Sequence, residues 1–385
     1  MKITAIELDI LESPYEYGMA DDASDSRGPK YALLVRVRTD EGIVGIADCD
    51  SHPHVMKALI DAPRYLKAFS EGLKYAVIGE NPFEYDKIWA NMYQSAFYQG
   101  RRGAAIHAMS AIDIAIWDII GKAAGQPVSV MLGARNHERI KAYASTLFRR
   151  TPEAMKEAVR KYRSLGYRAM KFGWGVVTED PRRVVPLVAA ARKEAGNDMD
   201  IMVDGMWTPD VKLAIQLVKE LEQYGVFFVE EPLHSDNLEG YRKLSNAVNA
   251  RIACGEQLGG LYEYKQLIAE ADIDIIQPDV SRAGGLTETR KLVTMAEQAG
   301  KLIIPHAWTS DVLTAASLHL NAYQKHPLFQ EFCTNDTPLS RDLVLEPLRL
   351  DADGYVAVPS GPGLGVALDE AAVRKYSVDA LAVTV

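Results

Sequence analysis

Apolar and polar positions alternate regularly through the central part of the chain, from about residue 141 to residue 350. Short apolar runs are separated by longer amphipathic stretches with helical spacing, the pattern of successive βα units around a parallel sheet. The apolar runs lie at residues 142–147, 169–172, 201–204, 226–230, 251–254, 273–277, 302–305 and 328–332. Because eight parallel strands can close on themselves, we predict an α/β fold with a (β/α)7β TIM-like barrel.

The first part of the chain has a different pattern. Residues 2–10 and 31–39 alternate as strands do, a turn follows at 40–42, and a further strand runs to Ala47 before helical stretches begin. This mixture predicts an α+β N-terminal capping domain.

The last part, from about residue 352, carries Gly361-Pro362-Gly363 and a short helix-like piece. We expect it to leave the barrel and pack back on the capping domain. The expected division of the chain is residues 1–130 for the capping domain, 131–350 for the barrel and 351–385 for the C-terminal segment.

Two polar loops interrupt the first domain, at residues 13–30 and 48–54, and the second reads DCDSHPH. Polar loops of this kind often cover a binding site. If the second loop closes over the barrel, His52 is a substrate-binding candidate. The alternative is that the loop is an ordinary polar surface segment.

Composition narrows the classes of protein. The chain has 385 residues, 48% hydrophobic and 25% charged, which is typical of a soluble globular protein and argues against disorder or a fibrous structure. The net charge of −9 repels nucleic acid and anionic membrane surfaces, so we expect neither as a partner. A small-molecule ligand is the better expectation, and an anionic one would need a local positive centre.

The three cysteines and the first ten residues indicate the cellular compartment of the protein. Cys49, Cys254 and Cys333 are scattered and form no CxxC pair, so we expect a reducing cytoplasm with neither disulfides nor a thiolate zinc site. The opening MKITAIELDI alternates like a strand and lacks the features of a signal peptide. The longest apolar stretch, residues 104–125, is interrupted by His107, Asp113 and Asp118, which argues against a membrane span.

Titratable side chains stand at the ends of consecutive predicted barrel strands, in the motifs MVDG, FFVEEP, IACGEQ, IIQPDV and IIPHAW. These motifs place Asp204, Glu230 with Glu231, Glu256, Asp279 and His306. Their spacings of 26, 26, 23 and 27 residues each fit one βα unit. Because the carboxyl ends of barrel strands converge on one face, we expect a shared site. Each acid alone could instead be a surface residue at a strand-to-loop junction.

Three acids on adjacent strand ends would repel one another in a partly buried cleft unless a cation neutralised them or some stayed protonated. A hard divalent ion resolves this conflict. Carboxylate oxygens without thiolates or a histidine cluster suit Mg²⁺, or Mn²⁺, with open positions for water or substrate oxygens. We therefore predict a divalent metal site.

The chain resembles the mandelate racemase subgroup of the enolase superfamily from the MKITAIE opening through GRRGAAIHAMSAIDIAIWDIIGKAAGQPV to the closing GPGLGV. The resemblance implies a sugar-acid substrate, a homo-oligomer and a set of site residues. The implied metal ligands are Asp204, Glu230 and Glu256, the implied base is the hydrogen-bonded pair His306 and Asp279, and Glu331 in LFQEF is the implied acid that hydrogen-bonds the substrate carboxylate.

One position departs from that family. The racemase-like pattern has Lys-x-Lys in the second barrel strand, whereas GYRAMKFGWG has Lys171 and then Gly173. Lys171 then resembles the first lysine, which stabilises the carboxylate or enediolate together with the metal and a protonated Glu331. Trp174 is an apolar wall for the vacated volume, and Trp308, two residues after His306, faces either the cleft or the next helix.

Charge and geometry predict the reaction. Removal of a proton α to a carboxylate creates an enediolate dianion, which a metal and a cationic partner can stabilise. A single base favours β-elimination of water over inversion, so we expect a Mg²⁺-dependent acid-sugar dehydratase with His306 as base. The alternatives are a cycloisomerase or epimerase acting on a sugar acid or its lactone, and a non-catalytic sugar-acid-binding relative.

Overall fold

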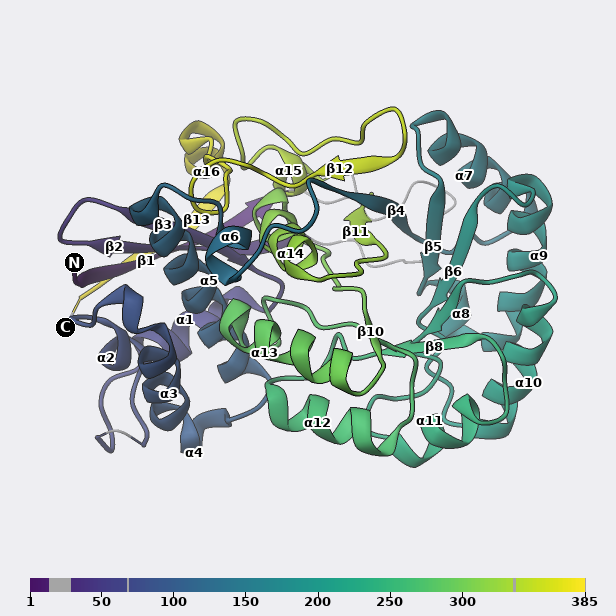
Figure 1. Ribbon diagram of the computed structural model, residues 1–385, viewed down its shortest axis with the longest axis horizontal. Helices are drawn as coiled ribbons and strands as arrows, with labels where there is room; N and C mark the ends of the chain where they lie inside the picture. The colour runs from purple at the N-terminus through teal and green to yellow at the C-terminus, as the bar shows by residue number, and fades with distance from the viewer. Residues whose placement is uncertain (14–28, 68, 335–336, 385) are drawn as a thin grey trace.

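The computed structural model describes residues 1–13, 29–67, 69–334 and 337–384 of the chain. Nearly all of the polar loop expected at residues 13–30 lies outside these ranges. Two parts of the chain can be distinguished in Figure 1, an N-terminal α+β part that also holds both termini and a larger part built from parallel strands and helices.

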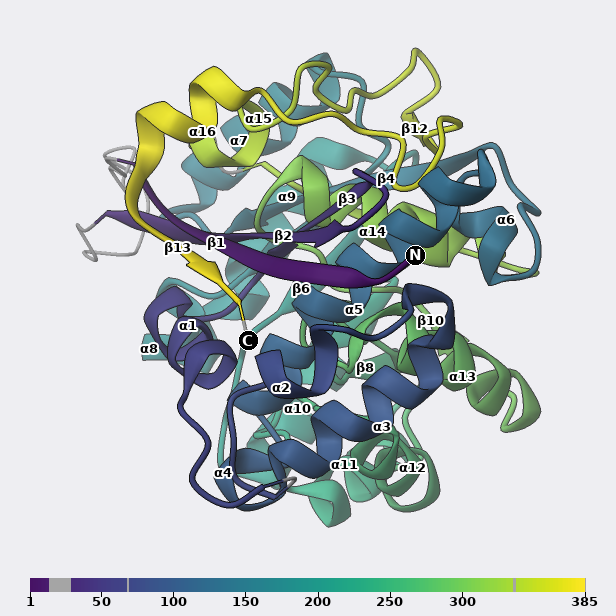
Figure 2. The ribbon, with the colours of Figure 1, turned by 90° about the vertical axis from the view of Figure 1, so that its left-hand side faces the viewer.

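Four antiparallel strands in the order β13-β1-β2-β3 form the N-terminal sheet (Figure 2). Their bounds are β1 Ile3–Ser13, β2 Lys30–Thr39, β3 Val44–Cys49 and β13 Ser377–Val383. The alternation seen in the sequence puts Ile6, Leu8 and Ile10 of β1 into the core. Gly42, with φ 79°, forms the predicted turn between β2 and β3.

The helices of this part cover one face of that sheet. Their bounds are α1 Pro53–Asp61, α2 Lys74–Val77, the 3-10 helix η1 Pro82–Glu84, α3 Tyr85–Ser95, α4 Phe97–Gly100, α5 Ala104–Ala124 and α6 Val128–Leu132. Helix α5 is long and apolar enough to cross a membrane, but 89% of its most apolar window is buried inside the protein. It packs against β2, β3 and α13, so it is the central core helix between the two parts.

Eight parallel strands follow one another in the larger part. They are β4 Arg139–Leu147, β5 Ala169–Gly173, β6 Asp200–Asp204, β7 Phe228–Glu230, β8 Arg251–Cys254, β9 Ile275–Ile276, β10 Leu302–Ile303 and β11 Gln330–Cys333. Strands β4 to β10 pair in sequence order, and β11 pairs with β4, as expected of a TIM-like barrel. Among the residues described, no ladder joins β10 to β11. The predicted (β/α)7β fold class is confirmed.

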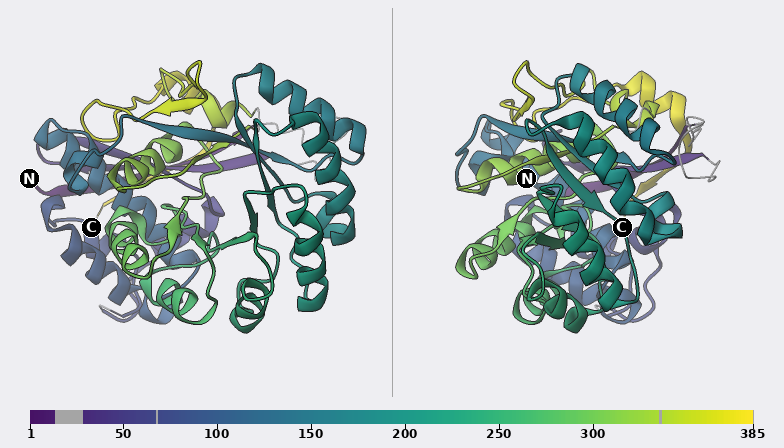
Figure 3. Two further views of the ribbon diagram at one scale, coloured as in Figure 1. Left: turned by 45° about the vertical axis from the view of Figure 1, so that its right-hand side comes forward. Right: turned by 90° about the vertical axis from the view of Figure 1, so that its right-hand side faces the viewer.

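Helices cover the outside of this sheet, and Figure 3 shows the teal and green ones along its outer face. Their bounds are α7 Pro152–Ser164, α8 Val176–Glu179, the 3-10 helix η2 Pro181–Arg183, α9 Val184–Ala195, α10 Val211–Glu222, α11 Leu238–Ser245, α12 Leu261–Glu270, α13 Gly285–Gln298 and α14 Asp311–Tyr323. Helix α7 shows why they form: Thr151 caps its first turn, and Met155, Val159 and Tyr162 face the sheet.

The C-terminal segment contains α15 Pro338–Arg341, β12 Tyr355–Ala357 and α16 Glu370–Tyr376 before β13. Strand β12 pairs antiparallel with β4 of the barrel, whereas β13 pairs with β1 of the N-terminal sheet. The segment thus contacts both parts of the molecule. The domain bounds at residues 130 and 350 stay a prediction.

His319 on α14 connects three segments and predicts a pH dependence of stability. The backbone N–H of Ser129 donates to its Nδ1 at 3.2 Å, and its Nε2 lies 3.1 Å from the carbonyl oxygen of Leu364. Burial lowers the pKa of His319 from 6.5 to about 4. The folded state therefore resists protonation of His319. The contribution of neutral His319 to the free energy of unfolding is present above pH 6.5 and is lost as the pH falls toward 4.

The glutamine of His319→Gln can still accept and donate hydrogen bonds but does not titrate. Between pH 7 and pH 4 we expect the free energy of unfolding to fall by about 3 kcal/mol less in this variant than in wild type. Urea unfolding of both proteins across that range is the measurement. Identical pH slopes would contradict the assignment.

Candidate metal and catalytic site

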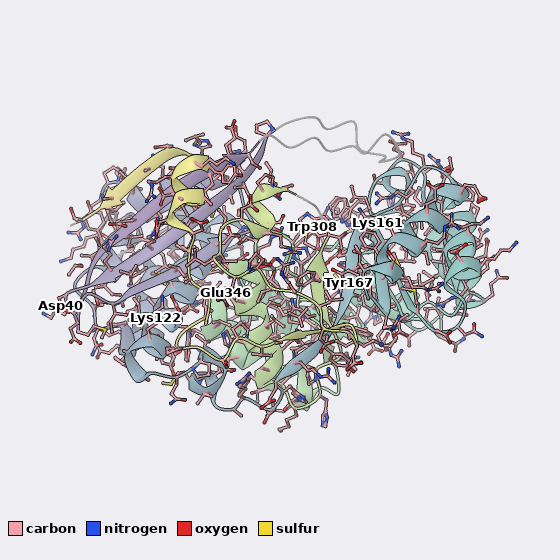
Figure 4. The ribbon with its side chains drawn as sticks, turned by 90° about the horizontal axis from the view of Figure 1, so that it is seen from above. Asp40, Lys122, Lys161, Tyr167, Trp308 and Glu346 are labelled. Atoms are coloured by element: carbon pink, nitrogen blue, oxygen red, sulfur yellow. The ribbon has the colours of Figure 1, made fainter. Side chains whose placement is uncertain are left out.

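A cavity of about 570 Å³ lies at the carboxyl ends of the barrel strands. Its lining comes from β4, β5, β6 and β11, from α8, from the segments after β8, β9 and β10, and from the loop after β3, which contributes Asp50. The volume suits a small ligand. Trp308, a lining residue, lies in the middle of the molecule between its two parts (Figure 4).

The three predicted metal ligands lie at this end of the barrel. Asp204 and Glu230 are the last residues of β6 and β7, Glu256 follows β8, and all three side chains are buried. Burial and the neighbouring carboxylates raise the pKa of Asp204 and that of Glu256, and they raise the pKa of Glu230 to about 7. Asp204 Oδ1 is buried without a hydrogen-bond partner among the residues that the structure describes. Packed acids with an unused oxygen fit a divalent cation.

Lys171 on β5 lies among these acids. Its Nζ is 2.7 Å from Glu230 Oε1, 2.9 Å from Glu331 Oε1 and 3.4 Å from Asp204 Oδ2, and its side chain is only 2% exposed. Burial alone would lower its pKa, but the three carboxylates raise it well above the ordinary value. Lys171 is therefore a fixed ammonium that neutralises part of the acid cluster, and it is unsuited to act as a base.

His306 and Asp279 are in direct contact, as the family resemblance implied. His306 Nδ1 lies 2.6 Å from Asp279 Oδ2, and Asp279 Oδ1 accepts hydrogen bonds from the backbone and hydroxyl of Ser281. His306 Nε2 faces the cavity, 3.4 Å from Glu256 Oε2. Burial lowers the pKa of His306, but Glu256, Glu331 and Asp279 raise it to about 10. The geometry leaves Nε2 as the atom available to a ligand.

Glu331 on β11 is buried beside Lys171 and His306. The backbone N–H of Ala307 donates to its Oε2 at 2.8 Å. Burial raises its pKa, yet Lys171, His306 and hydrogen bonds lower the pKa below the ordinary value. The nearby ammonium of Lys171 thus favours the ionised form of Glu331, and the role of Glu331 as a protonated acid stays a prediction.

Gly173 and Trp174 shape the wall next to Asp204. A Cβ atom on Gly173 would lie 2.6 Å from Asp204 Oδ2, so glycine leaves room for this carboxylate. Trp174 lines the cavity with a left-handed backbone, φ 54°. Its ring packs edge-on against Trp207, with centroids 4.4 Å apart. The apolar wall expected at Trp174 is present.

The two predicted substrate-binding residues differ in their placement. Trp308 is half-buried and lines the cavity. His52 is exposed, lies beside the ring of His54 and is outside the cavity lining. The structure therefore brings Trp308 to the site but leaves His52 at the surface, because its loop turns directly into α1.

Three further residues at the site were not predicted. Arg282 forms an ion pair with Asp50, and its Nε donates to the backbone oxygen of Asp50 at 2.8 Å. Gln277 Nε2 donates to Glu230 Oε2 at 2.6 Å. Sequence features could have pointed to all three. Arg282 lies three residues after Asp279, Gln277 lies two residues before it, and Asp50 is part of the DCDSHPH loop.

Asp50, Asp279 and His306 also approach one another, with ligand atoms within 4.8 Å. These groups already have partners, because Asp50 pairs with Arg282 and Asp279 holds His306 and Ser281. In the cluster of Asp204, Glu230 and Glu256, both oxygens of Glu230 are engaged by Lys171 and Gln277, whereas Asp204 Oδ1 has no partner among the described residues. The assignment of these three acids as metal ligands stays a prediction.

Comparison with known proteins agrees with this geometry. Residues 154–372 match the family described as "Enolase C-terminal domain-like", and residues 10–133 match "Mandelate racemase / muconate lactonizing enzyme, N-terminal domain". The chain is 32% identical to D-galactarolactone cycloisomerase of Agrobacterium fabrum, covering 98% of this chain and 99% of the relative. It is 31% identical to D-galactonate dehydratase of Pectobacterium atrosepticum, covering 92% and 93%.

A solved structure of a racemase from Streptomyces coelicolor A3(2) with bound magnesium superposes with a TM-score of 0.84. It has 25% sequence identity, with 98% of this chain and 100% of that chain covered. Together, the matched regions span both parts of the fold and nearly the whole length. The chain therefore belongs to the mandelate racemase and muconate lactonizing enzyme family of the enolase superfamily.

Proposed function

We propose that this protein is a Mg²⁺-dependent sugar-acid dehydratase that removes the proton α to the substrate carboxylate. The observation that carries the proposal is the pair His306 and Asp279, with Nε2 of His306 aimed into a cavity beside a cluster of buried acids. The family relatives named as dehydratases and as a cycloisomerase support it.

The proposed chemistry uses groups of this chain. Asp279 accepts the Nδ1 proton of His306 and so keeps Nε2 free to take the α proton of the substrate. His306 then returns this proton to the leaving β hydroxyl, the Cβ–O bond breaks, and water departs. The resulting enol takes a solvent proton at Cβ and gives a 2-keto-3-deoxy acid.

The metal is proposed to be held by Asp204, Glu230 and Glu256, whose packing and unused oxygen fit it. When bound, Mg²⁺ would supply positive charge for the developing enediolate and offset the carboxylate charge that raises the pKa of His306. Lys171 stays protonated beside Glu230 and Glu331 and adds a second positive charge. Mn²⁺ is the alternative ion.

Product analysis on a library of aldonates, aldarates and their lactones tests this proposal. A dehydratase yields a 2-keto-3-deoxy acid that reacts with semicarbazide and accumulates with turnover. The cycloisomerase alternative opens a ring without releasing water, and a specific observation favours it as second candidate, the similarity to D-galactarolactone cycloisomerase. The absence of any turnover with Mg²⁺ would favour a non-catalytic sugar-acid-binding protein.

Metal removal should abolish activity, and Mg²⁺ should restore it. Glu256→Gln should weaken Mg²⁺ binding, because it removes one of three negative charges around the ion. Titration of Mg²⁺ into chelated wild type and variant, followed by activity and by calorimetry, measures both effects. Full activity of the metal-free protein would refute the proposed site.

A single base predicts chemistry at one face of the α carbon. A second face can be protonated only by a group within hydrogen-bond reach, and Gly173 offers none, whereas Lys171 is engaged by three acids. We expect no inversion at C2 when the substrate and its C2 epimer are incubated separately in deuterated water. Deuterium at C2 with inversion would instead favour the epimerase alternative.

A cytoplasmic location and assembly as a homo-oligomer also belong to this proposal. All three cysteines are buried and free, which is compatible with a reducing compartment.

A further inference from the structure

The cavity has two chemically different ends. The inner end is formed by buried residues, among them Lys171, Asp204 and Glu331. The outer wall comes from the segment after β5 and from α8, where Thr178 and Glu179 are exposed. The proposed metal ligands and base at the inner end would hold the carboxylate and the α carbon of the substrate. The outer wall therefore faces the rest of the substrate.

Within the described lining, no cation is left for a second substrate carboxylate. Lys171 is engaged by Asp204, Glu230 and Glu331. The guanidinium of Arg282 is engaged by the Asp50 carboxylate and by the backbone oxygens of Asp50 and Glu256. The third cationic group, His306, is paired with Asp279 at the inner end.

The outer wall instead carries a negative charge. Glu179 forms no ion pair with any residue that the structure describes, and the Thr178 hydroxyl donates to the backbone oxygen of Gly175 at 2.7 Å. Substrate hydroxyls can donate to the Glu179 carboxylate, but a carboxylate at this position would be repelled by it.

Trp174 also favours an uncharged substrate end over a carboxylate, through its shape and its low polarity. Its indole is held in the lining by a left-handed backbone and by Trp207, and Gly205 permits the approach, since a Cβ there would lie 3.3 Å from the Trp174 ring. A rigid aromatic wall packs well against the C–H face of an uncharged sugar chain or ring. The face of the ring offers no hydrogen-bond donor to replace the water around a carboxylate.

From these observations, and resting on the function proposed above, we infer that the substrate carries a single carboxylate and that its far end is uncharged. Aldonates and the monolactones of aldarates belong to this class, whereas open-chain aldarates are rejected by Glu179 and by the lack of a free cation among the described lining residues.

Three matched acids test the inference with the Mg²⁺-loaded enzyme: an aldonate, the aldarate of the same configuration, and the monolactone of that aldarate. We expect kcat/KM to be at least about tenfold lower for the aldarate than for the aldonate or the lactone. Lactone formation removes the distal charge while nearly all heavy atoms of the aldarate are kept in a closed ring, so recovery with the lactone argues for a charge effect over a size effect.

Glu179→Lys should raise the ratio of aldarate to aldonate kcat/KM by about tenfold, because it replaces repulsion by attraction at an exposed position where folding is not at risk. Glu220→Lys, the same change on the outer helix α10, should leave that ratio at the wild-type value. A wild-type preference for the aldarate, or an unchanged ratio in Glu179→Lys, would overturn the inference while the proposed function stands. A chain that turns over none of these acids and exchanges no α proton would refute both.

Discussion

Replacement of His306 by asparagine is expected to lower kcat/KM for the sugar acid by about 10²–10⁴-fold, the range for loss of a general base. Asparagine keeps a polar side chain of similar reach but cannot take a proton. The loss should appear in solvent exchange of the α proton as well as in product formation, because both require the same proton transfer. Asp279→Asn should also reduce the rate, since the orientation of the imidazole depends on this carboxylate, but it should leave Mg²⁺ affinity nearly unchanged.

The matched control is His326→Asn, an exposed histidine that precedes β11 at the opposite end of the barrel. It should keep wild-type kinetics. If His306→Asn still exchanges the α proton at the wild-type rate, another group is the base, and the role given to the His306–Asp279 pair is wrong.

Lys171→Met is expected to destabilise the metal-free protein by about 3–5 kcal/mol, the scale for breaking a buried charge pair. The change keeps the aliphatic volume but leaves Asp204, Glu230 and Glu331 without their shared ammonium. Urea unfolding in the presence of chelator is the measurement, because a divalent ion would partly replace the lost charge. Added Mg²⁺ should therefore stabilise the variant more than it stabilises wild type.

Lys219→Met is the control for loss of a lysine charge, since Lys219 is exposed on α10. It should change stability by less than about 0.5 kcal/mol. Equal unfolding midpoints for Lys171→Met and wild type would show that the acids are neutralised in another way.

Much of the barrel could be predicted because its signals are local. Each parallel strand is a short apolar run, and the converging strand ends place titratable groups such as Asp204 and Asp279 on one face. Some observed strands, such as β9 and β10, are shorter than the predicted runs, whereas β4, β5 and β6 are longer. Strand β9 covers only Ile275–Ile276, although the backbone N–H of Gln277 still donates to the carbonyl oxygen of Cys254 and an isolated parallel bridge pairs Asp279 with His306.

Other features depend on contacts between distant parts of the chain, which no local pattern reports. The pairing of β13 with β1 joins the two ends of the sequence. The ion pair of Asp50 with Arg282 links the N-terminal part to the barrel. The approach of Lys171 to Glu331, which lowers the pKa of this acid, also joins two distant strands, so residue types alone could not report it.

The most direct test of the central claim follows the α hydrogen itself. A sugar acid labelled with deuterium at the α carbon, found by the library screen, is incubated with Mg²⁺-loaded enzyme in ordinary water, and the label is followed by NMR and mass spectrometry. We predict that one α deuterium is lost to solvent for each product molecule formed and that chelated enzyme releases none. Product that keeps its α deuterium, or equal label loss without metal, would contradict metal-dependent α-proton abstraction.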